Sequence, residues 1–127
     1  NIGYISAFTK LYNAFWRIRM KDILRELADV IESRRQNPAE GSYTCYLFEK
    51  GLDKILKKLA EECGETIIAA KNGDRELLCG EVCDLLYHLL VMANQCGLPL
   101  DDIYAELSRR SEKIGNLKKL KSVDNLT

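Results

Sequence analysis

Several features are scarce or missing in this sequence, and each absence narrows the class of protein. Lys plus Arg equals Asp plus Glu at 19 each, so the whole-chain charge does not favour a nucleic-acid partner. The longest nearly apolar run, 85–93, is too short to span a bilayer. The five cysteines are an odd number without a Cys-x-x-Cys pair. We therefore expect reduced thiols that pack as small buried hydrophobes, not disulfides or a zinc site.

Prolines are also scarce, and no stretch shows the alternation of apolar and polar residues that is typical of a strand. The two prolines, Pro38 and Pro99, both lie where a connection between helices is expected. Apolar residues instead recur at helical spacing in four segments. We expect these segments to form helices: 21–35, 46–71, 75–95 and 101–113.

Each expected helix has an apolar side, which we predict to face the core. In 46–71 this side holds Leu52, Leu56, Leu59, Cys63, Thr66 and Ile67. In 101–113, Ile103 and Leu107 are expected to face inward. Residues 85–93 are apolar nearly all round, which favours a central helix or one covered by a partner chain. The predicted fold is all-α, a bundle of about four to five helices based on a helical hairpin, with its core completed by dimerisation.

The first 19 residues differ from the rest, because they contain half of the aromatic residues and no acid. We considered an extra packing helix, an extension of uncertain origin before Met20, and, as a weaker choice, a membrane-surface helix. The domain organisation we expect is an extension over 1–19, a helical domain over 20–115 and a polar tail over 116–127.

Four acids form two pairs, Glu62 with Glu65 and Glu81 with Asp84. Residues three apart share one face of a helix. The sequence 72–74, Asn-Gly-Asp, combines a C-terminal glycine with an Asp N-cap and predicts a turn between antiparallel helices. Both pairs would lie about 12 Å from that turn and face each other, given a rise of about 1.5 Å per residue. Carboxylate oxygens in that number suit Mg²⁺ or Mn²⁺.

Acids three apart are also common on solvated helix surfaces. Here, however, Glu81, Asp84 and His88 share a stripe that is flanked by apolar residues, which favours a buried acidic site. His88 itself fits a hydrogen-bonded core residue better than a base or a metal ligand. Gly64 costs about 1 kcal/mol in a helix relative to Ala. Close approach of another group or tight helix packing would explain it equally well.

Three lysines, Lys54, Lys57 and Lys58, precede the acids on the same expected helix. Ammonium groups beside a carboxylate-metal centre are what a polyphosphate requires. An ordinary ion pair of Lys58 with Glu62 would explain one of these positions, but not the separation of lysines from glutamates along the helix. The acids and lysines together predict metal-assisted chemistry on a polyphosphate.

The paired motif Glu62-x-x-Glu65 and Glu81-x-x-Asp84 resembles that of the all-α nucleotide pyrophosphohydrolases, the MazG-like superfamily. The flanking residues narrow the resemblance to the phosphoribosyl-ATP pyrophosphatase family, to which the chain is similar over about 24–110. The segments that carry this similarity are 42–44, 47–48, 51–58, 69–74 and 84–91.

The resemblance implies Mg²⁺-dependent hydrolysis of phosphoribosyl-ATP to phosphoribosyl-AMP and pyrophosphate, in the second step of histidine biosynthesis. It further implies a cytoplasmic homodimer or larger homo-oligomer with composite sites. The metal ligands would be Glu62, Glu65, Glu81 and Asp84, and the catalytic acids Glu61, Glu62 and Glu65. The substrate-binding residues would be Ser42, Tyr43, Thr44, Lys54, Lys57 and Lys58. Ser42 could equally be a helix N-cap.

Two other functions fit parts of the pattern. One is a house-cleaning nucleoside triphosphate pyrophosphohydrolase with the same metal site. The other is a non-catalytic helical nucleotide-binding or scaffold protein, for which the four acids would be surplus. The flanking segments favour the phosphoribosyl-ATP reaction over both.

Overall fold

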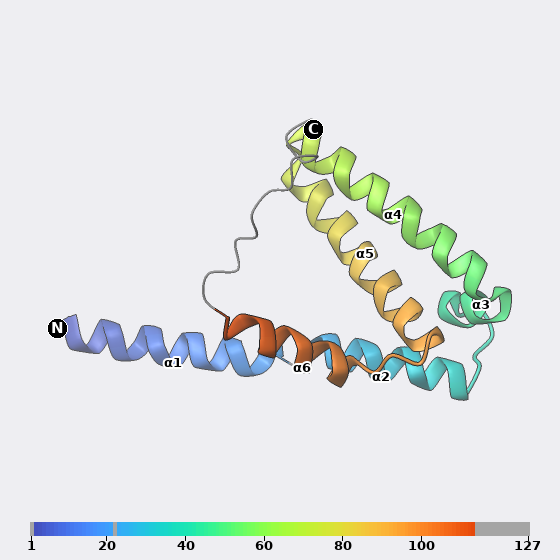
Figure 1. The fold of residues 1–127 in the computed structure, drawn as a ribbon. Helices are drawn as coiled ribbons and strands as arrows, with labels where there is room; N and C mark the ends of the chain where they lie inside the picture. The colour runs from blue at the N-terminus through green and yellow to red at the C-terminus, as the bar shows by residue number, and fades with distance from the viewer. Residues whose placement is uncertain (1, 22, 114–127) are drawn as a thin grey trace.

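The computed structural model describes residues 2–21 and 23–113, which form six helices and no strand. The helices are α1 (Ile2–Lys21), α2 (Ile23–Gln36), α3 (Tyr43–Lys50), α4 (Leu52–Asn72), α5 (Arg75–Gln95) and α6 (Leu100–Ser111). Figure 1 shows α4 and α5 as a long antiparallel hairpin, with α2 and α6 at the end far from its turn. The all-α class is confirmed. The helix count exceeds the expected four to five because α1 is helical and α3 is separate.

The helix predicted over 46–71 is divided at Gly51, and this prediction was wrong. Gly51 has φ 89 and ψ −175, a backbone conformation that side-chain-bearing residues rarely adopt. Its N–H donates to the Leu47 carbonyl oxygen at 3.0 Å, while its own carbonyl oxygen accepts from the Ile55 N–H at 3.2 Å. One residue therefore ends α3 and begins α4, and the chain changes direction without a longer loop.

The hairpin turn matches its prediction. Gly73 ends α4 in the left-handed conformation, with φ 72 and its N–H directed to the Ala70 carbonyl oxygen. Asp74 then caps α5, because its Oδ1 accepts a hydrogen bond from the Leu77 N–H at 3.0 Å. These two adjacent caps make the reversal short, and so fix which residues of α4 lie opposite which residues of α5.

A small apolar core lies where α2, α3, α4 and α5 meet. Its fully buried side chains are Ile31, Leu47, Ile55 and Val91. Partly buried hydrophobic residues pack around them, namely Leu27, Phe48, Tyr87, Leu90 and Met92. This core fixes one end of the α4–α5 hairpin and leaves the acidic pairs farther along it toward the turn.

The predicted inward side of α4 was partly wrong: Leu59 and Thr66 are partly buried as expected, but the other four residues are exposed. Leu52, Leu56 and Ile67 are 40, 41 and 68% exposed. The buried residues of α4 are instead Ile55, Glu62 and Ala69. Thr66 on that side still contacts α5, with its Oγ1 3.3 Å from the Glu81 carbonyl oxygen, but the part of the side that holds Leu52, Leu56 and Ile67 is exposed. It is consequently free to be covered by another molecule.

Two further predictions need correction. Leu107 on α6 is exposed, although Ile103 is partly buried as expected. Four of the cysteines are exposed in this protomer and do not fill the core as small hydrophobes: Cys63, Cys79, Cys83 and Cys96. All five thiols are free, in agreement with the expected absence of disulfides.

The N-terminal segment is helical but does not bury its described aromatic side chains. In Figure 1, α1 extends away from the hairpin. Phe8, Tyr12, Phe15 and Trp16 are exposed, and Trp16 makes edge contacts with Tyr12 and Phe15 of its own helix. The segment is thus a helix, but these four side chains do not pack into the core of the protomer. The predicted tail over 116–127 lies outside the described residues.

Within the described ranges, no helix has the combination of length and apolar character that is needed to cross a membrane.

Candidate active site

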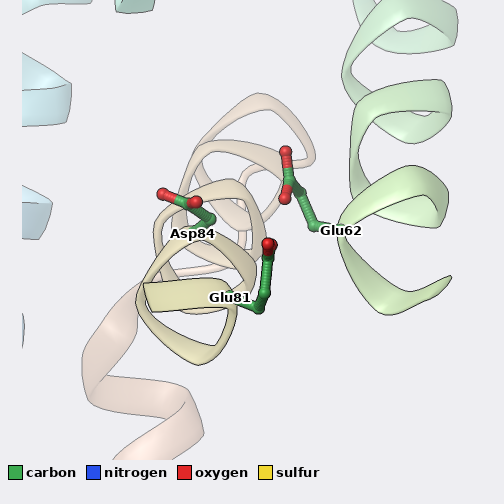
Figure 2. A group of neighbouring side chains, drawn as sticks. All are labelled: Glu62, Glu81 and Asp84. Carbon is green, nitrogen blue, oxygen red and sulfur yellow. The ribbon is translucent and has the colours of Figure 1, made fainter. Parts of the chain in front are cut away.

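The hairpin brings three of the predicted acids together. Glu62 on α4 and Glu81 and Asp84 on α5 each offer one carboxylate oxygen, and these oxygens all lie within 4.8 Å of one another. Figure 2 shows the Glu62 side chain directed from α4 toward the two acids of α5. The spacing of three and the predicted turn therefore yield the expected convergence of side chains from two helices.

Burial makes this group of acids electrostatically unfavourable in the absence of a partner. Glu62 is only 7% exposed, and the Oε2 atoms of Glu62 and Glu81 are buried without a hydrogen-bond partner in the described chain. Burial, and after it the charge of Glu65, raises the pKa of Glu62, and the same two causes raise that of Glu81. Buried carboxylate oxygens without donors require a proton or a cation nearby.

Glu65 lies at the edge of this group. Its side chain is exposed, and it is not one of the three residues whose oxygens gather within 4.8 Å. It is nevertheless close enough for its charge to raise the pKa of both Glu62 and Glu81. The fourth predicted ligand is thus adjacent to the other three and is more accessible to solvent.

Of the three predicted lysines, Lys58 lies directly beside the acids. Lys58 Nζ is 2.9 Å from Glu61 Oε2 and 3.8 Å from Glu62 Oε1. The Lys58 hydrogen bond and charge lower the pKa of Glu61, with smaller effects from Lys57 and Lys54. Glu61 is thereby held as a carboxylate in an ion pair. Lys58 connects the surface acid to the buried one, and it is the predicted phosphate-binding lysine nearest to Glu62.

The three residues 42–44, which were predicted to bind substrate, have three different environments. Ser42 caps α3, because its Oγ accepts a hydrogen bond from the Cys45 N–H at 3.3 Å. Thr44 is buried, and its hydroxyl hydrogen-bonds to the Tyr87 hydroxyl. Tyr43 is 44% exposed. Of the three, only Tyr43 combines exposure with a contact to the acidic end of the hairpin.

Two residues outside the predicted site organise it. His88 is 4% exposed, and its Nδ1 lies 2.7 Å from the Asp84 carbonyl oxygen and 4.0 Å from Glu62 Oε1. Thr66 Oγ1 donates a hydrogen bond to the Glu62 carbonyl oxygen at 2.7 Å and also reaches the Glu81 carbonyl oxygen at 3.3 Å. Thr66 had been assigned only to the apolar side of its helix, although its position four residues after Glu62 could have indicated this link.

Gly64 does not mark tight packing within the chain. A Cβ added at this position would meet nothing within 4 Å, and the same holds for Gly80 on α5. Of the two explanations for Gly64, tight helix packing does not hold within this protomer. The turn of α4 that carries Gly64 is left accessible to groups from outside the chain.

Comparison with known proteins identifies the relationship that this geometry fits. A family model described as phosphoribosyl-ATP pyrophosphohydrolase matches residues 24–111. The chain belongs to this family. The matched range contains the acidic pairs, the lysines, the 42–44 segment and His88, whereas α1 precedes it.

Individual phosphoribosyl-ATP pyrophosphatases agree with this family assignment. The one from Clostridium acetobutylicum is 56% identical over 97 residues, which cover 76% of this chain and 88% of the relative. That of Pelotomaculum thermopropionicum is 56% identical over 93 residues, 73% of this chain and 95% of the relative. That of Bacillus mycoides is 45% identical over 107 residues, 84% of this chain and its own whole length. The resemblance inferred from the sequence is confirmed.

Proposed function

We propose that the chain hydrolyses phosphoribosyl-ATP to phosphoribosyl-AMP and pyrophosphate, the second step of histidine biosynthesis, with a divalent cation at the α4–α5 acids. Its family membership supports the reaction. The observation that carries the metal assignment is the pair of buried, unpartnered oxygens of Glu62 and Glu81, gathered with Asp84 within 4.8 Å.

The residues present fit a hard cation. The donor set consists of carboxylate oxygens, which suit Mg²⁺, with Mn²⁺ as a substitute. Glu62, Glu65, Glu81 and Asp84 would hold it, with Glu65 contributing from the exposed edge. When bound, the cation would neutralise triphosphate charge and lower the pKa of an attacking water. Four clustered carboxylates repel one another in its absence, and this repulsion favours its binding.

The chain's own cations and acids would serve the substrate around that centre. Lys54, Lys57 and Lys58 are proposed to contact the phosphates and to stabilise charge on the leaving pyrophosphate. Glu61 is a candidate for accepting the proton of the water, but its ion pair with Lys58 lowers its pKa and makes it a weak base. If a phosphate group binds Lys58 and breaks this ion pair, the pKa of Glu61 rises toward its ordinary value and Glu61 becomes a stronger base. Substrate binding and activation of the base would then be linked.

The metal assignment is tested by measuring pyrophosphate release. Activity should require Mg²⁺, stop in EDTA and return when Mg²⁺ is added. Glu65→Gln and Asp84→Asn should each lose most activity while they keep helical circular dichroism. Glu26→Gln, which removes an exposed acid on α2, is the matched control and should keep full activity. Full activity of either site variant would show that the metal ligands are assigned wrongly.

The substrate is tested separately with a panel of nucleotides. Phosphoribosyl-ATP should be hydrolysed with a much higher kcat/KM than dCTP or ATP. A preference for deoxynucleoside triphosphates would favour the house-cleaning alternative, and nucleotide binding without turnover would favour a non-catalytic role.

We also propose that the functional form is a cytoplasmic homodimer or larger homo-oligomer. Large apolar side chains lie exposed along both helices of the hairpin, and covering them would stabilise the protein. On α4 and α5 they are Leu52, Leu56, Ile67, Ile68, Leu77, Val82, Leu86 and Leu89. Light scattering coupled to size exclusion should give at least twice the monomer mass. A monomer at micromolar concentration would contradict this proposal.

A further inference from the structure

The acidic centre is connected to the α3 N-terminus through one buried histidine. His88 Nδ1 lies 2.7 Å from the Asp84 carbonyl oxygen, and its Nε2 lies 3.2 Å from the Tyr43 hydroxyl. A carbonyl oxygen can only accept, so Nδ1 carries the proton in the neutral ring and Nε2 accepts from the Tyr43 O–H. The two contacts thus assign one tautomer and one ring orientation.

The remaining surroundings of the imidazole restrict it further. Tyr87 packs against the ring edge to face, with centroids 5.0 Å apart at 85°, and Tyr43 does so at 5.9 Å and 75°. His88 is 4% exposed. The ring cannot rotate without breaking both hydrogen bonds and displacing both tyrosines. It is therefore a fixed element between α3 and the hairpin.

The protonated edge of this ring faces the buried acid. Nδ1 is 4.0 Å from Glu62 Oε1, on a side chain whose other oxygen has no partner in the described chain. The N–H dipole at this position favours a carboxylate on Glu62 and attracts one of its oxygens. The orientation of His88 thus influences which oxygen of Glu62 is presented to Glu81 and Asp84.

We propose that Tyr43 and His88 are positioning residues that hold Glu62 in its metal-binding arrangement and couple the metal site to the α3 N-terminus. This inference rests on the proposed metal site. The Tyr43 residue is 44% exposed and close to Lys58, so Tyr43 is the accessible end of a connection whose other end is the buried Glu62. Removing a residue that orients a metal ligand without binding the metal itself typically weakens metal affinity by about 10–100-fold.

The test measures Mg²⁺ binding directly, by calorimetry on the full chain without substrate. Tyr43→Phe removes the hydroxyl that fixes the ring. His88→Asn keeps a donor near the Nδ1 position and loses the Nε2 acceptor. Each should weaken Mg²⁺ binding by about 10-fold, and the double variant should be no weaker than the single ones, because both break the same connection. At saturating Mg²⁺, kcat should recover.

Tyr87→Phe is the matched control. It also removes a phenol hydroxyl from a tyrosine that packs against His88, but that hydroxyl is hydrogen-bonded to Thr44 and not to the imidazole. It should lower thermal stability and leave the Mg²⁺ affinity unchanged. Equal Mg²⁺ affinities for Tyr43→Phe, Tyr87→Phe and the unmodified chain would overturn the proposal. So would additive effects in the double variant.

Different variants test the metal site and the positioning role of Tyr43. Glu62→Gln and Asp84→Asn test the metal site itself, and unchanged Mg²⁺ binding in both would remove the proposed site together with the connection to Tyr43. If those variants lose Mg²⁺ while Tyr43→Phe binds it normally, only the positioning role fails. Should His88→Asn not fold, Tyr43→Phe alone decides, because Tyr43 is 44% exposed whereas His88 is 4% exposed.

Discussion

The two sides of α4 differ in which residues are buried: an acid is buried on one side, and large hydrophobic residues are exposed on the other. The side that packs against α5 contains Glu62, 7% exposed, between the buried Ile55 and Ala69. The other side contains Ile67, 68% exposed, and Leu56, 41% exposed. A charged group is thus inside the protomer while large hydrophobic residues of the same helix are outside it.

This inversion is informative because each side is unfavourable for an isolated chain. A buried carboxylate without a donor costs free energy, and so does an uncovered apolar surface. Both costs disappear if a cation fills the acidic side and a second protein surface covers the apolar one. The comparison therefore indicates a helix whose sequence is adapted to two partners on two sides.

The largest expected effect comes from neutralising the acidic side. Glu62→Gln should lower kcat/KM by about 10³-fold, since loss of a metal-centred interaction is worth several kcal/mol in the transition state. In EDTA the same variant should be more stable than the unmodified chain, because a repelled, buried carboxylate is gone. Kinetics and thermal unfolding measure the two effects. A variant that is inactive and also less stable in EDTA would contradict this account of the acidic side.

The apolar side should respond through assembly. Ile67→Glu places a charge where we propose that a partner packs, and should weaken dimerisation by at least about 10-fold, as expected when an interface core residue is lost. Analytical ultracentrifugation measures this change. Leu107→Glu, an exposed apolar position on α6, is the matched comparison and should leave the mass unchanged. The opposite ranking of the two variants would place the interface on α6.

A smaller effect is the pH dependence of thermal stability, which should arise from the acidic side of α4. The pKa values of Glu62 and Glu81 lie above the ordinary 4.5, mainly through burial. The folded state therefore binds these protons more tightly, and the resulting stability is full below about pH 4.5 and is lost as pH rises through the raised values. In EDTA, the melting temperature should rise modestly from pH 7 to pH 5.

A carboxyl with a lowered pKa, such as Glu106, affects stability at a lower pH. Arg109 and Arg110 lower the pKa of the exposed Glu106 to about 2, so its contribution is lost only as pH falls well below 4.5. Saturating Mg²⁺ should abolish or reverse the rise, since protons then compete with the cation. If the melting temperature in EDTA did not change with pH, the ionised forms of Glu62 and Glu81 would not destabilise the folded protein.

The smallest expected effect concerns the open turn of α4. Gly64→Ala should stabilise the EDTA-treated protein by up to about 1 kcal/mol, because Ala is the better helix former and its Cβ would meet nothing within 4 Å. Urea unfolding measures it, with Gly80→Ala on α5 as the matched variant. If Gly64→Ala alone also weakens dimerisation or raises KM, the space at that turn receives a partner or substrate.

Local signals predicted the hairpin and most of the acidic centre. Gly73 and Asp74 are a helix stop and a helix start in adjacent positions, and acids three apart need only a helix to converge. The break at Gly51 was missed, because a glycine inside a periodic segment does not reveal the sign of its φ. The Tyr43–His88 contact was missed too, since it joins residues 45 positions apart through the packing of α3.

Local sequence patterns are enough to establish that the chain is helical, where the hairpin turns, and which acids share a face, because each property depends on contacts within a few residues. The burial of Glu62, the exposure of Ile67, the Thr44–Tyr87 hydrogen bond and the contacts of His88 with Tyr43 and Asp84 depend instead on how the helices pack. Periodicity states which residues share a side of a helix. Only the packing of the other helices states which side is covered.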